Sequence, residues 1–395
     1  MTEFVLPQGF RFAGVHCGIR ERADLALVLS DRPAAAAGVF TQNRVVAAPV
    51  KLCRARLPHD NVRGVVVCAG NANACTGEQG LRDAERMAEL AAREVGCEPR
   101  QMLVASTGVI GRPLPMDKLE AGIPKAATLL GSAANDFAVV TNAILTTDTR
   151  PKVASRRVPL EGGGPVNVVG FAKGAAMIGP NLATMLAFVL TDARVPAAPL
   201  HALLRSAADR SFNCISVEGH TSTNDTVLIL ANGASGQTIA GREFGPFDAA
   251  VTAVCADLAK MIAADAEGAK HFVTLDVEGL PDDESARTIA KAIADSALVK
   301  TAIYGADPNW GRIISAAGYA GVPFEEAEVS LWLGDLSLYR AGSPLQFDAA
   351  TASAYLKRNR DVSLRLVCGT GPGRCTFWTC DLTPEYVRLN ADYTT

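Results

Sequence analysis

The chain has 395 residues, of which 49% are hydrophobic and 20% are charged, and its formal net charge is −3. This length predicts two or three domains, and this composition is typical of a globular protein in water. The small negative charge excludes a strongly basic field for nucleic acid and a polybasic patch for membrane lipids. We therefore expect a protein that acts on small molecules, with no nucleic acid and no membrane as partner.

The ten cysteines and five histidines show no metal-binding spacing, since neither C-x-x-C nor H-E-x-x-H occurs. Most cysteines lie in apolar runs such as GVVVCAG, which predicts buried free thiols and neither a metal nor a cofactor. Free thiols without a secretory signal favour a reducing cytoplasm. The apolar stretch 174–190 is short for a membrane span and contains Pro180, Asn181 and Thr184, so we expect no span there.

The first third of the chain combines strands with helices. Residues 64–77, GVVVCAGNANACTG, predict a buried strand that runs into a loop of small residues, and such a loop brings backbone groups close to a ligand or to another segment. β-branched and apolar runs between turn formers predict further strands over 24–30, 37–45 and 101–111. Apolar residues at helical spacing predict helices over 80–96 and 116–130.

The strand over 101–111 is interrupted at Ser106-Thr107-Gly108. A glycine after a strand exposes its amide, and the neighbouring hydroxyl adds a second donor. Two such donors can stabilise a developing oxyanion, each contact being worth about 3–4 kcal/mol. A plain turn between strand and loop is the alternative interpretation.

A polar run, TTDT at 146–149, follows an apolar segment and is typical of a helix or strand end with capping residues. The Pro- and Gly-punctuated segment 150–174 predicts a hairpin. The triple glycine at 162–164 is its turn, because it lacks the spacing of a phosphate loop. Lys173 follows, eleven residues before Thr184. Its ammonium can pair with a substrate carboxylate, unless it is an ordinary surface lysine.

The segment 173–192, KGAAMIGPNLATMLAFVLTD, places a small residue, Ala183, directly before the hydroxyl residue Thr184. If the backbone is strained at this bond, the Thr184 hydroxyl can attack the Ala183 carbonyl, and an N-to-O acyl shift and hydrolysis then cut the chain. The new α-amine, with a pKa of about 8, lies within reach of its own hydroxyl, so one residue supplies nucleophile and base. The alternative is a buried strand or helix in which Thr184 is a packed polar residue.

The second half predicts mixed elements and, from about residue 325, short strands and turns. Glu267 ends a predicted helix, where an acid opposes the helix dipole, and this mild misfit favours a functional reason for it. His220 suggests a triad, but a threonine with its own amine needs no imidazole, so we leave it out of the site. The elements expected are a helix after Pro199, a strand over 226–233, a helix over 247–268, a strand over 270–279, a helix over 284–305 and a small helix over 348–358.

Several strings resemble the ornithine acetyltransferase family, the glutamate N-acetyltransferases of arginine biosynthesis, over most of the chain. They are KG, PN and ATML within 173–192, GNANA at 70–74, STGVIG at 106–111, TSTNDT at 221–226 and YVRLNADYTT at 386–395. One departure is His220, where the family more commonly has an aspartate.

The resemblance, together with mixed strands and helices in no strict βαβ rhythm, indicates an α+β fold. It implies a four-layer αββα sandwich of the self-processing N-terminal-nucleophile type, with a smaller C-terminal α/β domain. The precursor would be cut into an α chain (1–183) and a β chain that carries the nucleophile part (184–280) and the C-terminal domain (281–395). The two chains would stay together as an (αβ)2 heterotetramer.

The resemblance also implies the function and the site. The enzyme would move acetyl from N-acetylornithine to glutamate by a ping-pong route through an acetyl-threonine, with no cofactor. Whether acetyl-CoA also serves as a donor stays open at this point. Thr184 would be the nucleophile after cleavage at Ala183-Thr184, and Thr107 and Gly108 would form the oxyanion hole. The substrate-binding residues would be Thr147 (with Thr146 as the neighbouring alternative), Lys173, Thr184, Glu267, Asn390 and Thr395.

Two other functions stay open at this point. A hydrolase or aminopeptidase with an N-terminal nucleophile would form the same acyl-enzyme and resolve it with water. A binding protein without catalysis would keep the fold, and an uncut purified chain would favour it.

Overall fold

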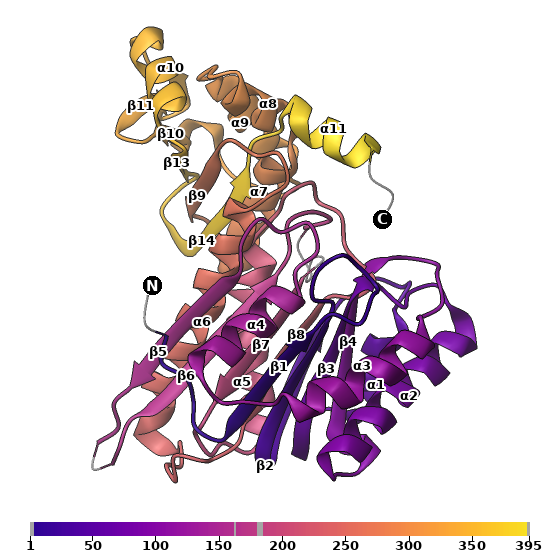
Figure 1. Ribbon diagram of the computed structural model, residues 1–395. Coiled ribbons are helices and arrows are strands. Elements are labelled where there is room, and N and C mark those ends of the chain that lie inside the picture. Colours follow the sequence, from indigo (N-terminus) through magenta and orange to yellow (C-terminus); the bar gives the residue numbers. More distant parts are fainter. Residues whose placement is uncertain (1–3, 162, 180–184, 393–395) are drawn as a thin grey trace.

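The computed structural model describes residues 4–161, 163–179 and 185–392. Within these residues the chain forms an eight-stranded sheet and a six-stranded sheet, each with helices packed against it. Figure 1 shows the larger sheet in the indigo to magenta part of the chain and the smaller one in the orange and yellow part at one end.

The larger sheet bends at β2, a 16-residue strand. The first half of β2 pairs with β1 and β3, and its second half pairs with β8. The bend lies at the exposed residues 31–33, where Pro33 cannot donate to a ladder and the register with β3 shifts. The prediction of separate strands over 24–30 and 37–45 was therefore wrong, since one bent strand runs from Leu25 to Phe40 and residues 41–45 lie outside it. In the order β4-β3-β2-β8-β7-β6-β5, with β1 on β2, the strands are β1 (Phe10–Val15), β2 (Leu25–Phe40), β3 (His59–Asn71), β4 (Met102–Val109), β5 (Lys152–Val158), β6 (Val166–Lys173), β7 (Leu186–Thr191) and β8 (Thr226–Ala231).

Helices α1 to α6 cover this sheet. The helices predicted over 80–96 and 116–130 are confirmed as α2 and α3. Helix α6 ends at Ala264, earlier than predicted, so Glu267 lies beyond the helix and does not oppose its dipole. The helices are α1 (Ala48–Arg56), α2 (Gly77–Val95), α3 (Met116–Thr128), α4 (Ala134–Ala143), α5 (Ala197–Asp209) and α6 (Phe244–Ala264), with 3-10 turns at Pro99–Gln101, Phe212–Cys214, Gly241–Glu243 and Glu326–Glu328.

The arm of the sheet that contains β6 to β8 is buried on both faces, which explains the unbroken apolar sequences of β7 and β8. Phe188 of β7 belongs to the core built with β1 to β4 and α1 to α4, and its neighbour Val189 belongs to the core built with α5 and α6. In the first core the Phe188 ring stacks on Phe171, with 5.0 Å between the ring centroids, and Phe137 of α4 meets Phe171 edge-on.

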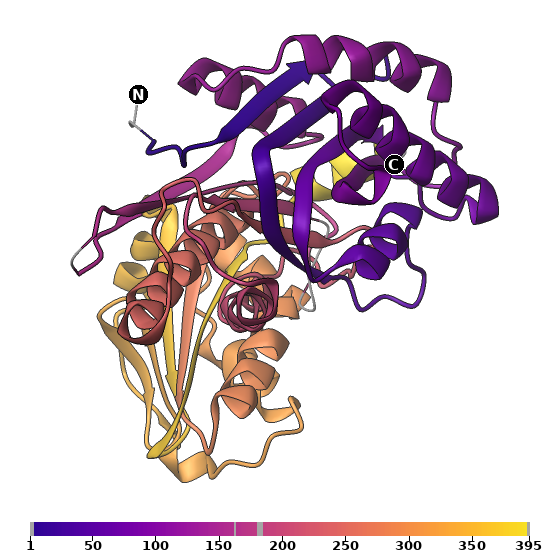
Figure 2. The same cartoon turned by 90° about the horizontal axis from the view of Figure 1, so that it is seen from below.

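Among the described residues this arrangement gives four layers, helix, sheet, sheet and helix, in which the two arms of the bent sheet are the inner layers. Figure 2 shows the purple N-terminal helices on one side of the strands and the pair α5 and α6 on the other. The predicted α+β sandwich is confirmed. None of the described helices combines the length and the apolar composition that a membrane crossing requires.

The smaller sheet begins with β9, ahead of the boundary expected at residue 281. The single helix predicted over 284–305 was wrong, because Ser296 adopts an extended conformation, ends α7 and caps α8 by accepting the Val299 N–H. The strands, in the order β12-β11-β10-β13-β9-β14, are β9 (Phe272–Gly279), β10 (Ser330–Leu333), β11 (Leu336–Arg340), β12 (Ser343–Pro344), β13 (Asp361–Val367) and β14 (Gly371–Cys380). The helices are α7 (Asp283–Asp295), α8 (Ala297–Tyr304), α9 (Trp310–Gly318), α10 (Ala349–Arg358) and α11 (Pro384–Asp392).

Candidate active site

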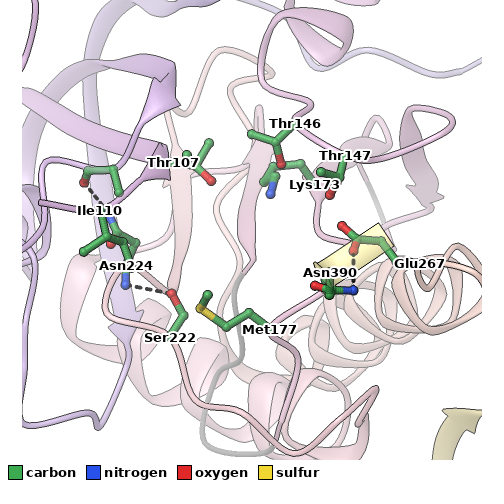
Figure 3. Close-up of a pocket in the computed structure, with 13 residues that line it drawn as sticks. Thr107, Ile110, Thr146, Thr147, Lys173, Met177, Ser222, Asn224, Glu267 and Asn390 are labelled. Atoms are coloured by element: carbon green, nitrogen blue, oxygen red, sulfur yellow. Dashed lines mark hydrogen bonds between the residues drawn. The ribbon is translucent and has the colours of Figure 1, made fainter. Parts of the chain in front are cut away.

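A pocket of about 690 Å³, its open mouth included, lies where several segments end together. Strands β4 and β6 end at this pocket, and α11 reaches it from the C-terminus (Figure 3). Its lining residues are Ala72, Thr107, Gly108, Ile110, Thr146, Thr147, Lys173, Ala176, Met177, Ser222, Asn224, Glu267 and Asn390. The fold thus brings together residues that are more than 300 positions apart in the sequence.

Most of the site residues inferred from the sequence lie in this lining, namely Thr107, Gly108, Thr147, Lys173, Glu267 and Asn390. Thr146 lines it as well, so two of the three threonines of the 146–149 run face the pocket. His220 is exposed and absent from the lining.

Ala183, Thr184 and Thr395 lie outside the described residues. The described chain resumes at Met185, whose backbone N–H donates to Asp225 Oδ1 at 3.2 Å. Leu186 then pairs with Lys173 in the sheet. The first described residues after the expected cleavage site are therefore direct neighbours of a lining residue.

Thr107 and Gly108 lie at the end of β4, beside the parallel strand β3. Gly108 has φ of +131°, and a Cβ placed there would lie 2.3 Å from the carbonyl carbon of Gly70. No other residue fits this position without moving the backbone of β3. The close approach of the two strands therefore determines where the Gly108 amide lies.

Asn224 is a site residue for which the sequence supplied only a matching string and no role. Its Nδ2 donates to the backbone carbonyls of Ala72 at 2.6 Å and Ser106 at 2.9 Å. Asn224 therefore joins the small-residue loop to the end of β4, next to Thr107. The signal that could have identified it is its place in TSTNDT, directly before the buried strand β8.

The asparagines of the loop at 70–74 bind backbone. Asn71 Nδ2 donates to the carbonyls of Arg112 and Pro113, and Asn73 Nδ2 donates to the carbonyl of Gly80. Within this loop Ala72 is the residue that reaches the pocket lining. The sequence predicted that this loop brings backbone groups close to a ligand or to another segment. The hydrogen bonds of Asn71 and Asn73 show the contact with other segments.

Lys173 is only 3% exposed, and its Nζ lies 3.9 Å from Asp148 Oδ2. Burial lowers the pKa of the Lys173 ammonium, while the Asp148 carboxylate works in the opposite direction. For Asp148, burial alone would raise the pKa, but Lys173, Lys152 and the Gly174 amide outweigh it, and the pKa falls below its usual range. The sequence indicated Asp148 only as part of a capping run, whereas the structure makes it a buried carboxylate behind Lys173.

Glu267 and Asn390 form one side of the pocket, where Asn390 Nδ2 donates to Glu267 Oε2 at 3.2 Å (Figure 3). The Glu267 backbone N–H donates to the carbonyl of Ala175 at 2.9 Å, which holds this residue against the segment that follows Lys173. Asn390 also donates to the carbonyl of Tyr386, one turn earlier in α11. The C-terminal helix thereby contributes directly to the pocket.

Asp225 is fully buried beside this site. Its Oδ1 accepts the Met185 N–H, and its Oδ2 has no hydrogen-bond partner among the described residues. Burial raises the pKa of this carboxyl well above its ordinary value. The sequence marked Asp225 only as part of the TSTNDT string and gave it no role.

Glu218 holds the segment that leads to the expected cleavage site. One carboxylate oxygen accepts the Ile178 N–H, and the Ile178 carbonyl accepts N–H donors from Val217, Glu218 and Gly219. Burial raises the pKa of Glu218 to about 8, against a smaller opposing effect of the Ile178 N–H and Lys300.

Glu218→Gln should therefore remove a pH-dependent loss of stability. The folded protein keeps a proton on Glu218 up to about pH 8, while the unfolded chain releases it near pH 4.3, so wild-type stability falls as the pH rises between these values. Glutamine keeps the shape of the neutral acid. We expect urea unfolding to give nearly equal free energies near pH 4 and an advantage for the variant of up to about 5 kcal/mol near pH 9. If the free energy of unfolding changed with pH by the same amount in both proteins, the raised pKa of Glu218 would be contradicted.

This chain is similar to proteins of one known family along nearly its whole length. The model of the ArgJ family matches residues 11–395. The arginine biosynthesis bifunctional protein ArgJ of Rhodopirellula baltica is 47% identical over 100% of this chain and 97% of its own length, and that of Symbiobacterium thermophilum is 48% identical over 98% of each. A crystal structure of the protein of the same name from Bacillus halodurans is 40% identical, with a TM-score of 0.51, and covers 52% of this chain and 98% of its own.

Proposed function

Because the chain belongs to the ArgJ family, whose members are bifunctional enzymes of arginine biosynthesis, we propose that it transfers acetyl from N-acetyl-L-ornithine to L-glutamate. The observation that carries this proposal is the pocket that gathers Thr107, Gly108, Lys173 and Glu267 next to the start of β7. It combines donors for an oxyanion with a buried lysine and a carboxylate that suit an amino acid.

The proposal includes a cut between Ala183 and Thr184, which would give an α chain (1–183) and a β chain (184–395). The Bacillus halodurans chain supports it, since about half of this chain covers nearly all of that one. Further support comes from the sheet, in which β6 and β2 precede the cut and pair with β7 and β8 behind it. The two chains would stay associated, because separating them would expose unpaired strand edges. We extend this to an (αβ)2 heterotetramer in the cytoplasm.

In the proposed reaction the Thr184 hydroxyl attacks the acetyl carbonyl of N-acetylornithine, and the Thr184 α-amine takes the hydroxyl proton. The Thr107 hydroxyl and the Gly108 amide donate to the oxyanion that forms. The tetrahedral intermediate collapses, the amine of ornithine leaves with that proton, and an acetyl ester remains on Thr184. The amine of glutamate then attacks the ester, N-acetylglutamate leaves, and the threonine is restored.

Lys173 would bind the substrate carboxylate, and Glu267 would bind the side-chain ammonium of ornithine. Thr147, Asn390 and Thr395 would orient the amino-acid part that both substrates share, which lowers the barrier by proximity. This chemistry needs no cofactor. Acetyl-CoA would serve as a second donor, which would add amino-acid acetyltransferase activity.

The assay that tests this function measures products, with N-acetylornithine as donor and glutamate as acceptor. We expect ornithine and N-acetylglutamate to accumulate in equal amounts, because one acetyl group passes between them. Acetate in place of N-acetylglutamate would contradict the proposal and identify a hydrolase. A parallel reaction with acetyl-CoA and glutamate, without N-acetylornithine, tests the second donor.

A further inference from the structure

Behind the pocket lies a cluster of buried charges to which the reaction above assigns no role. Lys152, on β5, is fully buried. Its Nζ lies 2.6 Å from Asp148 Oδ1 and 2.6 Å from Asp265 Oδ2, so one ammonium bridges two carboxylates. None of these three residues is in the pocket lining.

Each carboxylate of this bridge lies within two residues of a pocket-lining residue, Asp148 next to Thr147 and Asp265 near Glu267. Asp148 accepts the Gly174 N–H at 2.6 Å, directly after Lys173, and the Thr146 N–H at 3.0 Å. Asp148 thereby joins the end of β6 to the 146–149 run.

On the other side of the bridge, Asp265 follows α6 and precedes Glu267 by two residues. It accepts both the backbone N–H and the hydroxyl of Thr149. Lys152 connects the Asp148 side, with Lys173, to the Asp265 side, with Glu267. Two further contacts join the same two sides, namely the Thr149 bonds to Asp265 and the bond from the Glu267 N–H to the Ala175 carbonyl.

Stability alone does not explain these charges. Removing a lysine and two carboxylates from water is costly, and a well-packed apolar set of similar volume is often as stable. What the ions supply is defined geometry, since charged hydrogen bonds of this kind hold two backbone segments at one spacing.

We propose that Lys152 is a positioning residue that sets the spacing between Lys173 and Glu267 and thereby selects the length of the amino-acid donor. The inference rests on the proposed function, in which these two side chains bind the carboxylate and the distal ammonium of N-acetylornithine. The donor it favours is an N-acetylated α-amino acid whose ammonium lies at the distance found in ornithine.

The test compares the wild type with Lys152→Met/Asp265→Asn, which removes the bridge to the Glu267 side, keeps the charge balanced and leaves Asp148 opposite Lys173. Donors are N-acetylornithine and Nα-acetyl-lysine, which is longer by one methylene, with glutamate as acceptor. One methylene is ordinarily worth about 10- to 200-fold in selectivity. We expect the KM for N-acetylornithine to rise by about tenfold or more and its preference over Nα-acetyl-lysine to narrow by about fivefold or more.

Lys300→Met is the matched control. Lys300 is also buried, and its Nζ donates to Thr379 Oγ1 at 2.9 Å and to the Cys380 carbonyl at 2.5 Å, none of which lines the pocket. This variant should lower the unfolding temperature and leave KM and donor preference unchanged. Lys152→Arg keeps the charge but lengthens the bridge, so it should fold and also change the preference. If the double variant is insoluble, the donor preference of Lys152→Arg tests the positioning role of Lys152.

Wild-type KM and wild-type preference in the folded variants would overturn the positioning role and leave the cluster a stabilising contact only. A wild-type protein that transfers no acetyl from N-acetylornithine would overturn the proposed function and this inference with it. The two failures are distinguishable because the wild type is measured in every series.

Discussion

Replacing Thr184 with alanine should leave one uncut chain of 41.3 kDa that transfers no acetyl group. The same hydroxyl is proposed to attack the Ala183 carbonyl during cleavage and the acetyl carbonyl during transfer, so its loss removes both reactions. The α-amine that serves as base is also never released. Gel electrophoresis under denaturing conditions shows the first effect, and the N-acetylglutamate assay shows the second.

Thr191→Ala is the control for this experiment. Thr191 is the last residue of β7, is buried, and accepts the Ala193 N–H with its hydroxyl at 3.2 Å. Losing that bond costs about 1 kcal/mol of stability, and the chain should still be cut and active. A Thr184→Ala protein that is cut between residues 183 and 184 would refute the proposed nucleophile.

Gly108→Ala should reduce kcat by about 10²- to 10³-fold, the loss expected when an oxyanion-hole donor is displaced. The new methyl group would lie 2.3 Å from the Gly70 carbonyl carbon and 2.7 Å from the Asn71 nitrogen, so β3 and β4 must move apart. The φ of +131° adds backbone strain for any residue with a side chain. Steady-state kinetics on the soluble, folded fraction give the result.

Gly111→Ala, three residues further on, separates the effect of the steric clash on the Gly108 amide from the effect of backbone strain at a positive φ. Gly111 also has a positive φ, +79°, but a Cβ there meets nothing within 4 Å. It should cost about 1 kcal/mol of stability with kcat close to the wild type. If Gly108→Ala kept wild-type kcat, the Gly108 amide would have no part in holding the oxyanion.

Local patterns predicted most of the elements in this fold. Strands β3 and β4 and helices α2 and α3 follow from apolar runs and helical spacing, and the structure contains them. The errors came from non-local packing. Pro33 and its exposed neighbours look like the end of a strand, yet β2 continues because β8 pairs with its second half. Ser296 looks like an ordinary helical residue, yet it caps a new helix.

Six of the residues that line the pocket could be named from the sequence, because the family resemblance assigns roles to them. Their supporting residues could not, since each acts through a distant partner. Lys152 meets Asp265 across more than a hundred residues, and Asn224 meets Ala72 across a longer span. A local pattern contains no sign of such contacts. Asp148 shows the difference clearly, because TTDT predicts a cap, and only the fold places its carboxylate behind Lys173.

The central claim is that Thr184 becomes an N-terminal residue that carries acetyl. Intact-mass analysis of purified protein incubated with N-acetylornithine alone tests it most directly. We predict two fragments, of which the heavier begins Thr-Met-Leu-Ala and has gained one acetyl group that disappears when glutamate is added. A folded, soluble preparation that contains only the full-length chain, or a fragment from Thr184 that never gains acetyl, would contradict this account.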